Sequence, residues 1–288
     1  MSEDQRFHTL LRMGFVSVSR FRLAAVGALA ACLLGSVAQA ASPALSGVRP
    51  SGGQRGTERE VTLSGARLKD AQEIIFYRAG IKVKKMDPGN DKGTALKAVF
   101  QIGPDCPLGE HPLRVRTASG LSDIATFQVG PFPDIAETEP NDDFGAPQAV
   151  GLDVTVDGTV KNEDVDHFVV EAKKGQRISA EIEAMRLGGA LFDPYLAILD
   201  SRRFELAVAD DTPLLAQDGA ASIVAPEDGK YIIQVRESSY GGGNNFHYRL
   251  HVGGFSRPLA VFPAGGRRGK RSRRVSLAIR PESSPRKS

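Results

Sequence analysis

The sequence contains no tryptophan, and only 7% of its 288 residues are aromatic. This scarcity argues against a surface of stacked aromatic rings that would bind sugars or nucleic-acid bases. The formal net charge is +3, and the excess of arginine and lysine lies near the C-terminus, at 267–274. Because no aromatic residue separates these charges, we expect no nucleic-acid partner. The remainder of the chain is about neutral or slightly acidic.

The first 40 residues have the pattern of a secretory signal peptide. Arg20 and Arg22 provide positive charge, 23–34 is apolar, and Ala38-Gln39-Ala40 offers small residues for cleavage. The apolar run is shorter than the roughly 20 residues that a membrane span requires. We therefore expect export to the periplasm, the cell surface or the extracellular medium. Removal of this segment would leave Cys106 as the single cysteine, so no internal disulfide is expected.

Cys32 leaves a second form of the exported chain open. Leu29-Ala30-Ala31-Cys32 resembles the lipobox of bacterial lipoproteins, in which the cysteine is acylated and becomes the new N-terminus. The apolar run continues past Cys32, which favours the soluble form. Contact with a membrane is therefore expected only through a lipid anchor at Cys32.

Short runs that alternate polar and apolar residues, separated by glycine and proline, predict an all-β chain of two tandem β-sandwich domains. The spacing of the first runs predicts a compact sandwich over 45–130. The runs that carry this prediction are 60–65, 73–77, 112–117 and 126–129.

Gly130-Pro131-Phe132-Pro133 interrupts this pattern, and an acidic stretch follows it. Proline cannot continue a sheet ladder, so we place a domain boundary and an acidic linker at 131–143. A second sandwich is predicted over 134–252, with Asp157-Gly158 and Asp228-Gly229 as turns between its strands. Its predicted strands are 167–171, 177–183, 195–199, 230–235 and 248–252.

An internal repeat marks a third region, 259–288. The sequence from Pro50 to Thr57, PSGGQRGT, returns from Pro263 to Lys270 as PAGGRRGK. A polar, basic sequence follows the second copy, whereas a full domain follows the first. The region is therefore the start of a truncated third module or a disordered basic tail. Truncation, for example by a frameshift, is the favoured interpretation.

The motifs of the two sandwiches resemble known families. The segment 50–65 resembles an immunoglobulin-like IPT/TIG module, and 134–252 resembles the bacterial pre-peptidase C-terminal (PPC) domain, a jelly-roll-like β-sandwich of secreted peptidases and surface proteins. The pair behind a signal peptide resembles exported proteins of planctomycete-type bacteria. The PPC motifs are, in order, Glu137-Thr138-Glu139-Pro140-Asn141-Asp142, Asp164-Val165-Asp166-His167-Phe168, Gly175, Asp193-Pro194-Tyr195-Leu196, Asp210-Asp211 and Gly229-Lys230-Tyr231.

The resemblance also implies a calcium site, because some PPC domains bind calcium through the acidic linker and carboxylates near the start of the sandwich. Calcium takes about six to eight hard oxygen ligands, so clustered carboxylates suit it. The alternative is a linker that is simply solvated, as acidic runs usually are. The matching residues are Glu137, Glu139, Asn141 and Asp142 in the linker, completed by Asp164 or Asp166 in the sandwich.

Two further acidic groups are interpreted as turns. Asp210, Asp211 and Asp218 lie between predicted strands, where turn residues are common. The segment 87–93 lacks the ligand spacing and the distal glutamate of an EF-hand.

No catalytic site is expected, since neither His-Glu-x-x-His nor Gly-x-Ser-x-Gly occurs in the sequence. His247 and His251 lie on a predicted strand about 13 Å apart, too far to share a metal. His167 is interpreted as a half-buried packing residue beside Phe168. Cys106 is interpreted as a bystander in a turn with no histidine signature around it.

Together these features predict an exported, non-catalytic binding, adhesion or spacer protein. Calcium would stiffen its acidic linker, and its exposed sheets would contact an extracellular protein, matrix or polysaccharide. The competing interpretation is a truncated fragment of a secreted peptidase or other hydrolase whose catalytic domain is missing. A third is a module that helps a peptidase to remain folded during export and is then cleaved.

Overall fold

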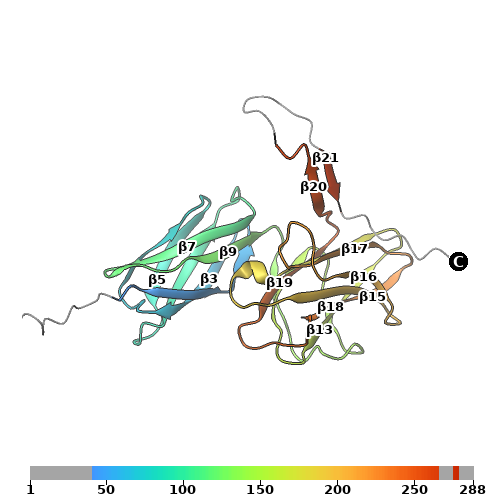
Figure 1. Cartoon of the computed structure of the whole chain (residues 1–288), viewed down its shortest axis with the longest axis horizontal. Coiled ribbons are helices and arrows are strands. Elements are labelled where there is room, and N and C mark those ends of the chain that lie inside the picture. Colours follow the sequence, from blue (N-terminus) through green and yellow to red (C-terminus); the bar gives the residue numbers. More distant parts are fainter. Residues whose placement is uncertain (1–40, 266–274, 279–288) are drawn as a thin grey trace, which may run out of the picture. The chain divides into compact units, whose positions relative to one another are not determined.

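The computed structural model describes residues 41–265 and 275–278, and almost all regular structure in this part of the chain is β-strand (Figure 1). The predicted all-β class is confirmed. A single 3₁₀ turn, Met185–Leu187 (η1), interrupts the strands of the described part. The predicted signal peptide, Cys32 and the basic residues at 267–274 lie outside the described residues. A search of the described residues for a helix long and apolar enough to cross a membrane finds none.

Nine strands between Ala44 and Gly130 form a first sandwich of two sheets. One sheet has the order β1-β3-β6-β5, and the other has the order β2-β9-β7-β4 with the short β8 beside β7. The pair β2–β9 is parallel and the other pairs are antiparallel. The strands are β1 (Ala44–Arg49), β2 (Gly52–Gln54), β3 (Glu58–Ala66), β4 (Ala71–Phe76), β5 (Ile81–Pro88), β6 (Ala95–Ile102), β7 (Gly109–Thr117), β8 (Gly120–Leu121) and β9 (Ala125–Gly130).

Alternation along the strands builds the core of this sandwich. In β6, every second residue from Leu96 to Ile102 is buried, as a strand with one face on the core requires. Phe100 lies at the centre of the core, with its ring edge-on to Phe76 and Phe127 at centroid distances of 5.0 and 5.3 Å. The core of the first sandwich is therefore closed by aromatic packing without a disulfide, since the sole cysteine in the described part is free.

Ten strands between Asp134 and Gly253 form a second sandwich of two five-stranded sheets. Their orders are β10-β12-β19-β14-β17 and β11-β13-β18-β15-β16. The strands are β10 (Asp134–Ala136), β11 (Gln148–Ala149), β12 (Val154–Thr159), β13 (Val165–Ala172), β14 (Arg177–Glu183), β15 (Pro194–Asp200), β16 (Glu205–Ala209), β17 (Ala220–Val224), β18 (Gly229–Glu237) and β19 (His247–Gly253).

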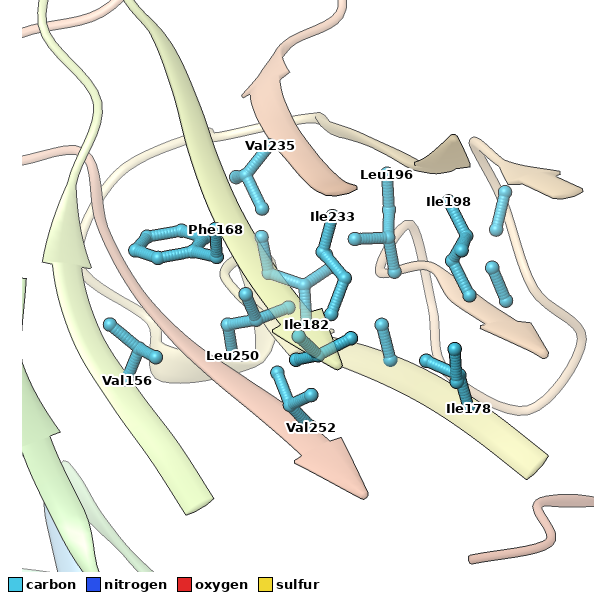
Figure 2. Close-up of a cluster of buried hydrophobic side chains, with 14 of the residues drawn as sticks. Val156, Phe168, Ile178, Ile182, Leu196, Ile198, Ile233, Val235, Leu250 and Val252 are labelled. Carbon is cyan, nitrogen blue, oxygen red and sulfur yellow. The ribbon is translucent and has the colours of Figure 1, made fainter. Parts of the chain in front are cut away.

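The core of the second sandwich is mainly aliphatic, with side chains of both sheets meeting between them (Figure 2). Phe168 from β13 and Ile233 from β18 face Ile182 from β14 and Leu250 from β19, and all four are fully buried. Full burial of one such side chain stabilises the fold by about 1.5–3 kcal/mol. This core fixes β13 and β19, the two strands that carry the site described below.

A third, two-stranded sheet pairs β20 (Pro258–Phe262) with β21 (Val275–Ala278). Phe262, which precedes the proline of the second repeat, pairs with Val275. Arg49, which precedes the proline of the first repeat, pairs in the same way with Thr62 of β3. The repeated sequence therefore corresponds to a repeated pair of strands, while 266–274 and 279–288 of the predicted third region lie outside the described residues.

The prediction of a turn at Asp157-Gly158 is wrong, because both residues lie inside β12 and pair with β19. The glycine has a packing role instead. A Cβ atom at Gly158 would overlap the phenol ring of Tyr248, its partner across the strands. Glycine in a strand often marks such a close approach. Asp228, by contrast, lies in a bend that leads into β18 at Gly229.

Replacing Gly158 with alanine should therefore lower the free energy of unfolding by about 1–3 kcal/mol, because the Tyr248 ring must move. Urea unfolding measures the change. Gly229→Ala is the matched control, since a Cβ atom there meets nothing within 4 Å and its expected effect is below about 1 kcal/mol. Equal losses in the two variants would contradict the packing role of Gly158.

Candidate metal centre

Four carboxylate side chains converge at the start of β13. One oxygen from each of Glu139, Asp142, Asp164 and Asp166 lies within 4.8 Å of the other three. The sequence left Asp164 and Asp166 as alternatives, and the structure brings both to the cluster. Glu137 is not a member of this four-residue group, but its side chain contacts the buried residues beside it.

Two of these carboxylates lie on the sandwich. The other two lie on the part of the predicted acidic linker that follows β10, which is called the acidic segment below. Asp166 lies on β13, and Asp164 lies just before it, where its Oδ2 accepts the Lys161 N–H at 2.9 Å. The acidic segment runs alongside, because the His167 N–H donates to the Asn141 carbonyl at 3.1 Å. The segment is held at its two ends by β10, which pairs with β12, and by β11, which pairs with β13.

Asn141 has its side chain buried against the carboxylates, with 1% of its surface exposed. With the amide nitrogen turned toward the cluster, it donates to Asp166 Oδ1 at 3.2 Å and to Glu139 Oε2 at 3.0 Å. With the amide reversed, its oxygen faces the same two carboxylates. The first orientation suits a cluster without a cation, and the second adds a fifth oxygen ligand for one.

Tyr248 supplies one hydroxyl to two carboxylates. Its oxygen lies 2.7 Å from Glu137 Oε1 and 2.7 Å from Asp166 Oδ2. A phenol carries one proton, so it donates to one of these carboxylates at a time. One carboxylate therefore faces the hydroxyl oxygen without receiving its proton. Because Asp166 is fully buried, this contact is repulsive unless a carboxyl group is protonated or a cation lies beside it.

The electrostatics of the cluster favour binding of a positive species. Burial, together with the charge of Glu137, raises the pKa of Asp166 to about 9. A hydrogen bond with Asp164 is the main reason that the pKa of Asp142 is raised. Burial is also the main cause that raises the pKa of Tyr248 well above its ordinary value. The cluster therefore holds a proton at neutral pH, in a place where a cation could replace it.

The donor set consists of carboxylate and amide oxygens, with neither sulfur nor imidazole nitrogen among the four gathered residues and Asn141. Such hard oxygen ligands suit calcium, which accepts irregular geometry and mixed carboxylate and amide donors. The residues fit a calcium ion.

The other acidic residues considered from the sequence have different environments. Asp218 is fully buried and accepts the Met185 N–H at 2.7 Å and Arg186 Nε at 2.6 Å, so it fixes η1. Asp210 and Asp211 are exposed and do not belong to the metal-type cluster found among the described residues. The segment 87–93 includes the end of β5 and a turn.

The histidines of the second sandwich have separate partners. His247 Nδ1 lies 2.8 Å from Thr159 Oγ1, and His251 Nδ1 lies 2.9 Å from Thr155 Oγ1. His167 is buried more deeply than expected, with 7% of its surface exposed, and it packs edge-on against Phe144 at a centroid distance of 5.8 Å. None of these three histidines belongs to the carboxylate cluster.

Cys106 has a histidine neighbour that the sequence interpretation missed. Cys106 Sγ lies 3.6 Å from His111 Nε2, and this nitrogen also lies 2.7 Å from the Pro107 carbonyl oxygen, to which it must donate. Both side chains are buried, and burial raises the pKa of the Cys106 thiol. The pair has the character of core packing, because a nucleophilic cysteine requires a lowered pKa and access to solvent.

No family model matches the chain, and no curated protein matches it. Among solved structures, the chain is similar to the pre-peptidase C-terminal domain of a collagenase from Bacillus anthracis, at 17% identity and a TM-score of 0.31, over 40% of this chain and 99% of that one. It is also similar to PliG of Aeromonas hydrophila, a periplasmic inhibitor of g-type lysozyme, at 18% identity and a TM-score of 0.29, over 42% and 97%.

A third similar structure is the Bacteroides ovatus protein SGBP-B in complex with a mixed-linkage heptasaccharide. Its identity is 12% and its TM-score is 0.26, over 73% of this chain and 52% of that one. Likenesses at this level concern the β-sandwich fold alone.

The raised pKa of Asp166 gives a pH dependence of stability in the presence of a chelator. The folded state holds a proton that the unfolded state has lost, between the ordinary pKa of 3.8 and the folded value of about 9. The free energy of unfolding should therefore fall as the pH rises, by roughly 1 kcal/mol per pH unit between pH 7 and 8.5. Urea unfolding at several pH values measures this slope.

Asp166→Asn keeps the shape of the protonated side chain and should remove most of this slope. Asp91→Asn, in an exposed turn of the first sandwich, should leave it unchanged. An unaltered slope in Asp166→Asn would show that Asp166 is ionised at neutral pH.

Proposed function

We propose that the chain is an exported, non-catalytic binding or spacer protein whose second sandwich holds a calcium ion at Glu139, Asp142, Asp164 and Asp166. The observation that carries the proposal is the convergence of these four carboxylates beside a buried tyrosine hydroxyl that two carboxylates share. A divalent cation would offset their mutual repulsion and leave the hydroxyl proton free for Glu137. Asn141 would add its amide oxygen.

Calcium would fasten the middle of the acidic segment, since its ends are already held by β10 and β11. Glu139 and Asp142 come from that segment, whereas Asp164 and Asp166 come from the sandwich. An ion bound to all four would join the segment to β13. A segment stiffened in this way loses less conformational entropy when the protein binds a partner.

A binding role agrees better than catalysis with the described residues. Cys106 and His111 form a cysteine–histidine pair of the kind that nucleophilic catalysis uses, but both residues are buried and burial raises the pKa of the thiol. The carboxylate cluster has Asn141 and Tyr248 as polar neighbours, and neither is a nucleophile paired with a base. An extracellular protein, matrix or polysaccharide is the proposed partner. Assignment of the first sandwich to the IPT/TIG modules and of the chain to planctomycete-type proteins stays a prediction.

Calcium at about 100 times its dissociation constant should stabilise the folded chain by about 2.7 kcal/mol. For a domain of this size, the midpoint of thermal unfolding should rise by at least about 5 °C. Calorimetric unfolding with calcium and then with excess chelator measures the shift, and titration calorimetry should give one ion per chain.

The shift should vanish in Asp164→Asn combined with Asp166→Asn. The matched control is Asp210→Asn combined with Asp211→Asn, which removes two exposed carboxylates outside the cluster and should keep the full shift. Stabilisation that survives the first pair of substitutions, or disappears with the second, would place the calcium elsewhere.

Hydrogen exchange tests the fastening of the acidic segment. The amides at 138–143 should exchange at least about tenfold more slowly with calcium than with chelator, while the core amides of β18 change little. If the acidic segment exchanged equally fast in both conditions, calcium would neutralise the carboxylates without stiffening the segment.

A further inference from the structure

One lysine supplies positive charge to the carboxylate cluster of the second sandwich. Lys161 lies in the connection between β12 and β13, and its Nζ lies 3.3 Å from Glu139 Oε1. No other cationic side chain in the described part of the chain forms an ion pair with Glu139, Asp142, Asp164 or Asp166. Lys161 is therefore the counter-charge that these described residues provide for the cluster.

The backbone around Lys161 is held by residues that also shape the cluster. The Lys161 N–H donates to Asp164 Oδ2 at 2.9 Å. The Gly243 N–H donates to the Val160 carbonyl at 3.0 Å, and a Cβ atom at Gly242 would overlap the Lys161 carbonyl oxygen. The glycine-rich loop after β18 therefore packs directly against this connection, and it fixes the point beside Asp164 from which the lysine side chain extends.

The charges of the cluster act on Lys161 beyond its contact with one carboxylate. The hydrogen bond to Glu139 and the charges of Glu139 and Asp164 raise the pKa of the Lys161 ammonium group. Lys161 acts on the carboxylates in return. The hydrogen bond with Asp164 raises the pKa of Asp142, and the charge of Lys161 opposes this rise. The ammonium group therefore stabilises the ionised form of more than one carboxylate.

A calcium ion at the cluster and the ammonium group of Lys161 would exclude one another. Both need the oxygens of Glu139, and two positive charges a few ångströms apart repel each other. The Lys161 side chain is 60% exposed, so its ion pair is weak and the ammonium group can move into solvent without becoming a buried, unpaired charge. Calcium binding would therefore displace Lys161 from Glu139, which lowers the affinity of the site for calcium.

We propose that Lys161 is an internal counter-ion of the calcium site, which binds Glu139 in the calcium-free protein and weakens calcium binding by competing for that carboxylate. The inference rests on the calcium site proposed above. Lys161 is not a ligand, but it sets the affinity of the ligands around it. Such competition suits a dissociation constant of about 10⁻⁴ to 10⁻³ M, the range of extracellular calcium modules.

The test compares Lys161→Met with a matched control, Lys173→Met, in the full chain. Lys173 Nζ lies 3.2 Å from Asp228 Oδ2 in the same sandwich, and this ion pair is outside the cluster. Each substitution removes one positive charge and one exposed ion pair while keeping an unbranched side chain. Titration calorimetry measures the calcium dissociation constant, and calorimetric unfolding in excess chelator measures stability without calcium.

Lys161→Met should bind calcium about three- to tenfold more tightly, because the ion no longer competes with an ammonium group. Lys173→Met should keep the affinity within about twofold of the unaltered chain. Lys161→Arg, which keeps the charge, should bind calcium much as the unaltered chain does.

In chelator the effect of Lys161→Met should have the opposite sign. The midpoint of thermal unfolding should fall by about 2–4 °C, because the carboxylates lose their counter-charge, whereas Lys173→Met should change it by less than about 1 °C. Tighter calcium binding together with lower stability in chelator is the signature of competition. A residue that only shaped the fold would lose calcium affinity and stability together.

The outcomes separate this inference from the calcium site itself. Saturable calcium binding with equal affinity in Lys161→Met and the unaltered chain would keep the site and overturn the role of Lys161. Weaker binding in Lys161→Met would also overturn it, since the lysine would then support the site. If calcium bound neither chain, the calcium site would be contradicted, and the competition with it.

Discussion

The second sandwich brings carboxylates together at a point where the surrounding residues offer too few hydrogen-bond donors to balance their negative charge. Asp166 is placed on β13 by the strand's pairing with β18, and its side chain is buried. Glu137 approaches from the segment after β10, and one hydroxyl, that of Tyr248, lies 2.7 Å from both carboxylates. A bound proton or a bound cation is therefore part of the folded state at this position.

Several features that look unrelated depend on this arrangement. Gly158 lies inside a strand because the phenol ring of Tyr248 crosses it to reach Glu137 and Asp166. The Lys161 N–H binds Asp164, which turns the chain so that Asp164 and Asp166 lie in one cluster. The acidic segment follows β13 closely, since its Asn141 carbonyl accepts the His167 N–H. The segment is therefore part of the sandwich as much as it is a linker.

Much of the fold could be predicted from the sequence, because strands with one face on the core alternate visibly. The prediction of 177–183 coincides with β14. β5 was missed, and an irregularity between Val83 and Lys85 interrupts its alternation. Asp157-Gly158 was assigned to a turn because Asp-Gly pairs are common in turns. The packing that requires this glycine involves Tyr248 of the partner strand, which is distant in the sequence. Motif resemblance proposed six ligands, and four of their carboxylates gather, whereas Glu137 is not in that group and Asn141 lies beside it. The role of Tyr248 could not be predicted, since nothing in the local sequence links it to the acidic segment.

The direct test of the calcium site uses terbium, which replaces calcium in oxygen-ligand sites and emits when a nearby tyrosine absorbs light. The chain contains no tryptophan, and the Tyr248 hydroxyl lies 2.7 Å from Asp166 Oδ2, so tyrosine excitation reports on this cluster. We predict saturable terbium emission at one ion per chain, displaced by calcium and lost when Asp164 and Asp166 are both changed to asparagine. Absence of sensitised emission, or emission that persists in that variant, would contradict the assignment of the cluster as a calcium site.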